Sequence, residues 1–518
     1  MSKRKVALAL AVIMSVSLIA TGCGGGGSAE DAAGKTELVV ATNQDPKDLH
    51  PYKRVSSQIL RINNQIFESL VKLGDENNTY VPGLATEWEY VDDGMAMQFT
   101  LREDVKFHNG ETMTADDVVY SFQAASKETA SSGGIDWLDW DGIKAVDDKT
   151  VYMPFTYKNS IALGYLATTN LYVVSQKAME EMGDGFGAKP VGTGAYMIDD
   201  WVQGDYIRLK AFDDYWGGKP KIETLTFRII PESSQAMIEL ETGGIDLALD
   251  ISGNDITRVE KNEELKMIRG RSVTNDFVCF NTSKEPFNNA TLRKAVAYAI
   301  DPNAILQAVY QGQGQIAYGP LTTDTWAFDE SLKTNPPYTY DLDKAKKLMV
   351  EAGYPDGGLT VELYIDDKAA RISAAEVIKN QLAAIGITVN IHSYDYATWF
   401  NILFEGTEDD MFLNGINAST GEPDKCFYQI MHKDFAVSGG TNMMRYVNDE
   451  FSKLLDDART STDDAFKEEC YIKAQQIFME DVPGIAYYQR NQECAARANL
   501  QGVKLIGESF DLTSCYFE

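Results

Sequence analysis

The sequence predicts an α/β fold with a section of hairpin strands inserted into it. The clearest α/β signal is a run of strand, helix and strand over residues 359–365, 371–385 and 387–392, in which the helix stops at Gly386. A helix between two strands indicates a crossover unit and a largely parallel sheet. Residues 80–151 differ, because short alternating strands there are separated by Asp-Gly and Asn-Gly dipeptides. Glycine accepts the positive φ that tight turns require, so this section predicts hairpins.

The other predicted elements alternate in the same way along the chain. The strands expected from short apolar runs are 36–41, 191–196, 206–210, 224–230, 245–249 and 277–281. The helices expected from apolar residues at helical spacing are 59–73, 233–242, 290–300 and 341–352. The order of these elements continues the α/β pattern on both sides of the hairpin section.

Residues 1–22 have the pattern of a secretory signal peptide. Three basic residues, Lys3–Lys5, precede an apolar run over 6–20 that is too short to span a bilayer. Small residues lead directly into Cys23, which resembles a bacterial lipobox, so we expect Cys23 to carry a lipid. Cleavage near residue 20 as an ordinary signal peptide is the alternative. Residues 23–35 predict a flexible tether, which would hold the protein at the extracytoplasmic face of the cell membrane.

Composition excludes several classes of function. The chain has 518 residues and a formal net charge of −30, which argues against a nucleic-acid partner because phosphate binding needs a basic face. Nearly five hundred residues after the signal imply several lobes. The cysteines after Cys23 are five in number and lack C-x-x-C spacing, so they favour neither a metal knot nor a disulfide framework.

Four stretches of the mature chain carry a family resemblance. They contain Trp88 with Asp93-Gly94, Phe99 and the run from Val105 to Gly110; Val191 to Tyr196 with Tyr215 to Pro220; Leu292 to Asp301; and Asp343 to Leu348 with Glu351 to Tyr354. In these stretches the chain resembles the family 5 bacterial extracellular solute-binding proteins, which include dipeptide-, oligopeptide- and nickel-binding receptors. Physically the stretches are mostly scaffolding, since Trp88 and Phe99 fall on facing hairpin strands and His108 serves a turn.

The resemblance implies a two-lobed periplasmic-binding-protein-like fold of type II, cluster C, with an extra α+β domain on lobe I. The implied division is lobe I over 36–73, 189–270 and 484–518, the extra domain over 74–188 and lobe II over 271–483. Two crossings of the chain between lobes allow a hinge near Arg271 and Pro483. Such a protein is no enzyme and needs no cofactor. It would act as a monomer that hands a peptide-like solute to the permease subunits of an ABC importer.

The resemblance also implies that residues 419–424 lie where the α-amino group of a peptide ligand binds. Peptide-binding relatives carry there an aspartate that pairs with the α-amino group of the ligand, but Ser419 stands at that position. A hydroxyl cannot supply the charge-assisted pairing of a carboxylate. Either Glu422 or Asp424 meets the amino group, or the ligand has no ammonium at this place. The basic partner for a dipeptide carboxylate has no match, and Arg371 is the nearest candidate, although a capping or surface role suits it better.

Other expected ligand contacts follow from the same resemblance. Relatives hold the ligand backbone on an extended segment, here Asn414, Gly415, Ile416, Asn417 and Ala418 within residues 412–418. The aromatic residues expected to line the pocket are Tyr394, Tyr396, Trp399, Tyr487 and Tyr488. The loop that contains Gly194 and Tyr196 is expected beside the cleft.

Three other functions compete with peptide capture. The first is hydrolysis, but the sequence has neither the G-x-S-x-G elbow nor the H-E-x-x-H pair that hydrolases use, so we do not expect a hydrolase. A nickel or metallophore receptor of the same family is the nearer alternative, with His392 and His432 as the possible ligands, but isolated histidines are weak evidence for metal. A surface chaperone or adhesin is the alternative from a different class.

Overall fold

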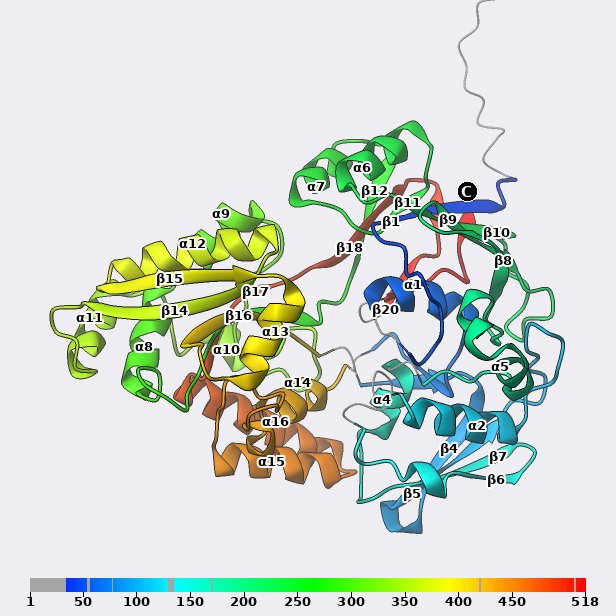
Figure 1. Ribbon diagram of the computed structural model, residues 1–518, viewed down its shortest axis with the longest axis horizontal. Coiled ribbons are helices and arrows are strands. Elements are labelled where there is room, and N and C mark those ends of the chain that lie inside the picture. The colour runs from blue at the N-terminus through cyan, green and yellow to red at the C-terminus, as the bar shows by residue number, and fades with distance from the viewer. Residues whose placement is uncertain are drawn as a thin grey trace, which may run out of the picture.

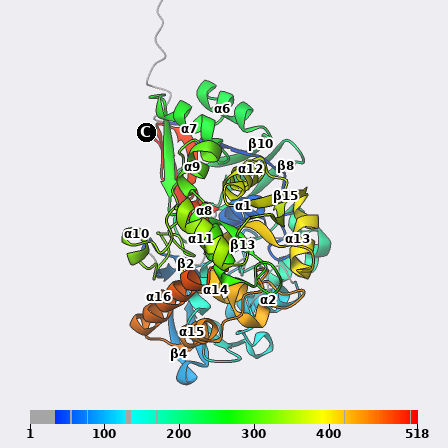
Figure 2. The same cartoon turned by 90° about the vertical axis from the view of Figure 1, so that its left-hand side faces the viewer.

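The computed structural model describes residues 34–53, 56–76, 78–128, 135–168, 171–418, 421–506 and 509–518. The chain forms two α/β bodies that lie side by side, with a further sheet and its helices beside the first body (Figure 1). We call the two bodies lobe I and lobe II after their sheets, and the further unit the extra domain. In the view at right angles, lobe II faces the viewer and lies in front of lobe I (Figure 2). Cys23 and the predicted signal peptide lie outside the described residues.

Lobe I is built on a seven-stranded sheet of order β12-β18-β11-β1-β10-β9-β8. Its strands are β1 (Glu37–Thr42), β8 (Tyr196–Val202), β9 (Tyr206–Ala211), β10 (Thr224–Ile229), β11 (Leu247–Ala248), β12 (Leu265–Gly270) and β18 (Gln492–Arg497). Strand β1 is parallel to β10 and β11, as the α/β pattern predicts. Its helices are α1 (Ser57–Ile66), α6 (Ser233–Thr242) and α7 (Gly253–Glu260).

Lobe II is built on a five-stranded sheet of order β15-β14-β16-β13-β17. Its strands are β13 (Thr274–Phe280), β14 (Leu359–Asp366), β15 (Ile387–Tyr394), β16 (Met411–Asn417) and β17 (Gly484–Gln489). The predicted crossover is confirmed, because β14 and β15 are parallel and α12 (Ala369–Ala383) joins them.

Helices cover both faces of the lobe II sheet. Successive side chains of a strand point to opposite faces, so neighbouring residues of one strand pack against different sets of helices. Val278 and Leu363 pack on one face with α8 (Ala290–Ala299), α9 (Pro302–Tyr310), α11 (Leu342–Glu351) and α12. Phe277 and Tyr364 pack on the other face with α13 (Tyr396–Glu405), α14 (Asp424–Met431), α15 (Asp449–Thr460) and α16 (Asp464–Asp481). Both cores are therefore closed from solvent.

The extra domain contains a four-stranded sheet of order β4-β5-β7-β6. Its elements are β4 (Ala85–Val91), β5 (Ala96–Leu101), α2 (Ala115–Ser126), β6 (Lys144–Asp147), β7 (Thr150–Pro154), α4 (Ala162–Thr168) and α5 (Gln176–Met182). The predicted hairpin is confirmed, since Trp88 lies opposite Phe99. Thr114 and Asp117 form the predicted capping box at the start of α2. The core of this sheet is continuous with the core of lobe I.

Short elements complete the described chain. They are β2 (Val71–Leu73), β3 (Tyr80–Pro82), α10 (Ser331–Thr334), β19 (Leu500–Gln501), β20 (Lys504–Ile506), β21 (Ser509–Asp511), β22 (Tyr516–Phe517) and the 3₁₀ turns 92–94, 140–142, 183–188 and 433–435. In the parts of the chain that the structure describes, no helix is both long and apolar enough to pass through a bilayer.

Three predicted boundaries are corrected by the structure. The helix predicted over 59–73 ends at Ile66, and residues 71–73 form a strand that pairs with residues 80–82. The strand predicted over 191–196 begins only at Tyr196. Residues 484–489, which the resemblance places in lobe I, form β17, which pairs with β13 in the lobe II sheet. The apolar patterns locate these segments but do not reveal their partners.

Two of the family-like stretches pack against each other. The His108 backbone N–H donates to Gly192 O at 2.9 Å, its Nε2 lies 2.9 Å from Gly194 O, and Gly192 N–H donates to its Nδ1 at 3.3 Å. A neutral ring that is protonated at Nε2 satisfies both side-chain contacts. Burial lowers the pKa of His108 to about 4, which agrees with a neutral ring. The predicted turn role of His108 thus extends to the loop at residues 192–194.

The same loop approaches the end of α1 so closely that only glycine fits. Gly194 N–H donates to Ile66 O at 2.8 Å, and an added Cβ at Gly194 would lie 2.5 Å from Gln65 O. We expect Gly194→Ala to destabilise the protein by about 1–3 kcal/mol, because the backbone of α1 would have to move. Calorimetric melting should show the loss. Gly185→Ala is the matched control, since nothing lies within 4 Å of its added Cβ. Equal melting of the two variants would contradict the close approach.

Asp409 carries a buried carboxyl just before β16, and the residue is 0% exposed. Burial raises its pKa to about 6, although Lys284 and Arg445 act in the opposite direction. A carboxyl pKa above its unfolded value stabilises the fold at low pH, and this stabilisation is lost as the pH rises through about 6. We therefore expect Asp409→Asn to raise stability at pH 7.5 by about 2 kcal/mol, with little gain at pH 4.

The neighbouring Asp410 is the control for this prediction. Its carboxylate accepts from Glu362 N–H at 2.9 Å and lies 3.3 Å from Lys284 Nζ. Asp410→Asn should therefore bring no gain at pH 7.5. Calorimetric melting at both pH values gives the comparison, and an Asp409→Asn variant that melts no higher than the parent at pH 7.5 would show that the buried carboxylate costs nothing.

Candidate functional site

Two segments of the chain cross between the lobes. One runs from the end of β12 to the start of β13 over residues 271–273, and the other joins β17 to β18 over residues 490–491. Gly270 lies opposite Gln492 on the lobe I side, and Asn275 lies opposite Gln489 on the lobe II side. The hinge predicted near Arg271 agrees with the first crossing. The hinge predicted near Pro483 is wrong, because β17 follows Pro483 and belongs to lobe II.

The strand directions place the carboxyl ends of both sheets next to these crossings. In lobe I, the first crossing begins at the carboxyl end of β12. Strands β12 and β11 are both antiparallel to β18, so β12 runs in the same direction as β11 and β1, and its carboxyl end lies at the same edge as theirs. In lobe II, β13 enters at the carboxyl end of its antiparallel neighbour β16, which is parallel to β14. Ligands of α/β folds bind outside the carboxyl ends of strands. The candidate site is therefore the region between these two edges.

The lobe I edge carries polar residues that the sequence analysis did not select. Arg61 Nη1 lies 2.8 Å from the Asp250 carboxylate, and its guanidinium lies 5.2 Å from the centre of the Phe510 ring. Gln58 donates to Asn43 at 3.2 Å. Asn43 and Asp250 follow the carboxyl ends of β1 and β11, and Figure 1 shows α1 on the side of lobe I that faces lobe II. Asn43 and Asp250 could have been identified from the sequence, because each is a polar residue that follows a strand.

The lobe II edge contains a stretch of β16 that extends past one of its neighbours. Strand β14 pairs with β16 only at Leu363–Met411 and Tyr364–Phe412, and β14 ends at Asp366. On the other side β13 pairs with β16 along its whole length. Ala418 N–H donates to Val273 O, so these two residues form a hydrogen-bonded pair of the antiparallel ladder. Such pairs alternate with non-hydrogen-bonded pairs, so Ile416 pairs with Asn275 through hydrogen bonds and Gly415 does not pair with Asp276 in this way. By this alternation the N–H and C=O of Gly415 point away from β13, toward the side where β14 has ended.

A charged cluster lies directly against Gly415, and we call Asp276, Arg371 and Arg490 the arginine cluster. Asp276 Oδ1 accepts from Arg371 Nη2 at 2.8 Å and from Arg490 Nη2 at 2.7 Å, while its Oδ2 accepts from Arg490 Nε at 2.9 Å. Burial alone would raise the pKa of Asp276, but the two guanidinium groups hold it below its usual value. Arg371 is thus a buried partner of Asp276, which corrects the expectation of a capping or surface role.

The predicted aromatic residues divide into packed and exposed side chains. Trp399 is buried and donates its indole N–H to Tyr364 O at 3.4 Å, and Tyr487 is also buried. Tyr488 stacks on Tyr310 with their ring centres 3.6 Å apart. Tyr394 is half-buried, and Tyr396 is exposed. Only these last two present much of their surface to solvent, so they are the aromatic residues we retain as candidates for the site.

The two predicted acids are internal contacts between lobe II and the extra domain. Glu422 accepts from Tyr80 Oη at 2.7 Å and lies 3.7 Å from Lys467 Nζ. Asp424 accepts from Tyr165 Oη at 3.2 Å. Burial raises the pKa of both carboxyls, although nearby cations act in the opposite direction. Both residues are 2% exposed, which corrects their selection as ligand contacts. Ser419 lies outside the described residues.

The remaining predicted contacts lie at different places. Within the segment Asn414–Ala418, residues 414, 415 and 417 are half-buried at the lobe II edge, whereas Ile416 and Ala418 are buried in the core. Gly194 is packed against α1, as described above, and Tyr196 is 0% exposed in the lobe I core. Packing accounts for both of these lobe I residues, so we do not retain them in the site.

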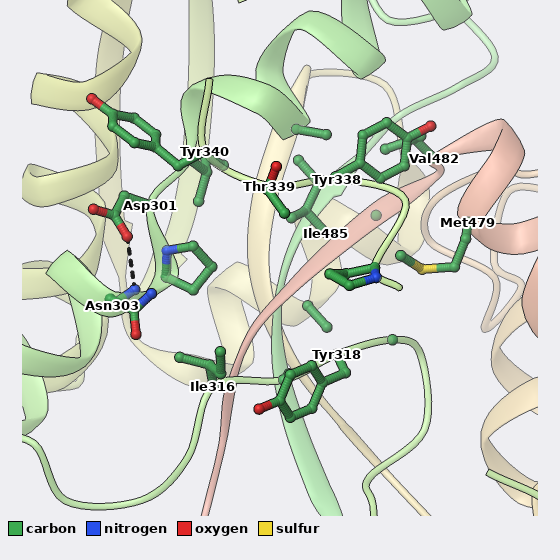
Figure 3. A pocket seen from close by; sticks show the side chains of 18 residues that line it. Asp301, Asn303, Ile316, Tyr318, Tyr338, Thr339, Tyr340, Met479, Val482 and Ile485 are labelled. Atoms are coloured by element: carbon green, nitrogen blue, oxygen red, sulfur yellow. Dashed lines mark hydrogen bonds between the residues drawn. The ribbon is translucent and has the colours of Figure 1, made fainter. Parts of the chain in front are cut away.

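A separate cavity of about 180 Å³ lies within lobe II (Figure 3). Its lining is mostly apolar and includes Tyr318, Tyr338, Met479 and Ile485. Asp301 also lines it, and the carboxylate of Asp301 caps α9. The cavity touches the first residues of β17, whereas the candidate site lies beyond the last ones. It is therefore not part of the space between the carboxyl edges.

The histidines named as possible metal ligands have other partners. His392 Nε2 lies 2.5 Å from the Glu362 carboxylate, and the His392 ring stacks on Tyr364. His432 is buried and stacks on Tyr428. Among the residues that the structure describes, no group of three or more histidine, cysteine, aspartate or glutamate side chains is arranged to hold a metal ion.

Comparison with known proteins identifies the family. Residues 79–436 match the model of the bacterial extracellular solute-binding proteins, family 5. Heme-binding protein A of Haemophilus influenzae is 28% identical over 93% of each chain, and oligopeptide-binding protein AppA of Bacillus subtilis is 28% identical over 97% of each chain.

Solved structures confirm the two-lobed fold that the resemblance implied. The periplasmic binding protein DppA of Helicobacter pylori, in complex with the peptide STSA, aligns with a TM-score of 0.79 at 27% identity, over 93% of this chain and 98% of that one. The chain belongs to the bacterial extracellular solute-binding proteins of family 5, which are receptors rather than enzymes.

Proposed function

We propose that the protein is the substrate-binding lipoprotein of an ABC importer and that it captures a peptide between its two lobes. The observation that carries the proposal is the open edge of β16 at Gly415, which offers backbone groups to a ligand beside the end of β14. An extended peptide can pair with such an edge as an added strand. Main-chain pairing gives affinity without demanding particular side chains, so the ligand would be defined by its backbone and its ends.

The relatives agree with a peptide ligand. AppA of Bacillus subtilis is named as an oligopeptide-binding protein, and the similar Helicobacter pylori structure holds a tetrapeptide. In the present chain Ser419 replaces the aspartate that would pair with an α-amino group, and Glu422 and Asp424 are engaged by the extra domain. We therefore propose that no carboxylate meets the amino group of the peptide at this position.

Capture requires that the lobes close on the ligand and open to release it. The two crossings offer hinge positions at residues 271–273 and 490–491, which connect the sheets without belonging to either. A few residues at a crossing can absorb the rotation of one lobe against the other. The closed monomer would then present both lobes to the permease subunits, which receive the peptide.

Peptide capture predicts retention and compaction. A tryptic digest of casein should leave short peptides bound to the purified protein after washing, and mass spectrometry of the denatured complex should detect them. Small-angle scattering should show a smaller radius of gyration with the digest than without it, because the lobes close. If no peptide is retained and the radius of gyration does not change, the peptide function is wrong. Retention without compaction would reject only the closing motion.

Attachment to the membrane is proposed through Cys23, which follows a signal segment and precedes a flexible tether. Cys23→Ala should move the protein from the membrane fraction to the soluble fraction when the full chain is expressed in a bacterium that processes lipoproteins. Cys279→Ala is the control, since Cys279 is buried in the lobe II core and should stay unmodified. Continued membrane retention of the Cys23 variant would reject the anchor.

A further inference from the structure

We infer that the ligand presents a carboxylate to Arg490, beside Gly415, so that the site selects solutes with a free carboxylate at the end bound by lobe II. The inference rests on the proposed function and adds to it the chemistry of one ligand end. It also adds a contact residue, Arg490, that the sequence analysis did not select. The evidence comes from the charge of the arginine cluster, from its exposure and from its position against β16.

The arginine cluster carries an excess of positive charge. Two guanidinium groups share the one carboxylate of Asp276, which leaves one net positive charge within a chain whose formal charge is −30. The nearest charges at the end of β14 do not remove the excess, because Asp366 and Lys368 pair with each other at 3.0 Å. A buried or half-buried positive charge favours an anionic partner and disfavours an ammonium group.

The cluster opens toward the site through Arg490. The side chains of Asp276 and Arg371 are 3% and 6% exposed, whereas the side chain of Arg490 is 40% exposed. Arg490 uses Nε and Nη2 to hold Asp276, and a guanidinium has five N–H donors, so donors remain for a ligand. Within the described residues, Arg371 Nη1 is buried and has no hydrogen-bond partner. The cluster thus has unused donors and one exposed member.

Gly415 brings the cluster and the open strand edge together. A Cβ at Gly415 would lie 2.8 Å from Arg490 Nη2 and 3.2 Å from both Arg371 Nη2 and Asp276 Oδ1. The absence of a side chain therefore lets the guanidinium groups lie against the strand. A peptide that pairs with β16 at Gly415 would place a terminal or side-chain carboxylate next to Arg490. A guanidinium recognises a carboxylate with parallel N–H donors, which gives direction as well as affinity.

The test compares two portions of the same tryptic casein digest, one untreated and one with its carboxyl groups converted to methyl esters. We expect the protein to retain the free acids at least about tenfold more than the esters, since a charge-assisted contact of this kind is worth a tenfold change or more. Equal retention of the two portions would overturn the inference and leave the peptide function standing. Retention of neither portion would overturn the proposed function and the inference with it.

Synthetic versions of a retained peptide then locate the carboxylate. One version has a C-terminal amide, and the other has its aspartate and glutamate residues replaced by asparagine and glutamine. Loss of binding by the first identifies the terminal carboxylate, and loss of binding by the second identifies a side-chain carboxylate. If both versions bind as tightly as the parent peptide, no carboxylate is recognised and the inference is wrong.

Variants of the protein assign the contact to Arg490. Arg490→Gln should weaken binding of the free-acid peptide by at least about tenfold but should bind the ester as the parent does. Arg269→Gln is the matched control, because Arg269 lies on β12 near the same crossing and pairs instead with Glu260 and Glu493. If Arg490→Gln and Arg269→Gln bind the free acid equally well, Arg490 is not the contact. Should Arg490→Gln fail to fold, the comparison of acid and ester on the parent protein still decides the inference.

Discussion

The pairing of Asp276 with Arg490 joins the two crossings between the lobes, and the arrangement of the lobes and of the candidate site depends on these crossings. Asp276 follows the first crossing between the lobes and Arg490 begins the second, so their two hydrogen bonds join both crossings at the point where they enter lobe II. Arg490 N–H adds a bond to Thr274 O, and Ser272 donates its hydroxyl to Arg490 O. Taking a carboxylate out of water costs several kcal/mol, and two guanidinium partners offset that cost. In the proposed closing motion, the rotation would therefore fall on the few residues on the lobe I side of this pair.

The same constraint places the candidate site. Because each crossing leaves or enters at the carboxyl edge of a sheet, the two edges with unpaired strand ends and polar side chains are brought next to each other. Lobe I contributes Arg61 and Asp250, and lobe II contributes the open edge of β16 with the arginine cluster. The extra domain and lobe II also touch each other directly, through buried tyrosine and carboxylate groups that include Tyr80 with Glu422.

Much of the fold could be predicted from the sequence, because the α/β pattern and the hairpins are local properties of the chain. The parallel pair β14 and β15, the hairpin of Trp88 and Phe99, and the capping box at Thr114 all depend on residues close in sequence. The placement of β17 in lobe I failed for the opposite reason, since β17 pairs with β13, a strand far away in sequence. The helix predicted past Ile66 failed although its segment 71–73 has a nearby partner at 80–82, because an apolar run does not by itself distinguish a helix from a short strand. An apolar run of six residues has no feature that says which sheet it joins.

The sequence by itself determined the family and the class of fold, because these follow from ordered motifs and from periodicity. The family resemblance also drew attention to the segment that forms the end of β16. It also indicated that Ser419 lacks the charge of the expected aspartate. Only the tertiary structure decided which charged residues are available. Glu422 and Asp424 are used in contacts with the extra domain, Arg371 is buried against Asp276, and Arg490 is left exposed beside Gly415. The reason is physical, since a side chain is available to a ligand only where partners from elsewhere in the chain leave some of its donors or acceptors unused. The partners that engage Glu422, Asp424 and Arg371 in these hydrogen bonds lie 95 to 342 positions away in sequence.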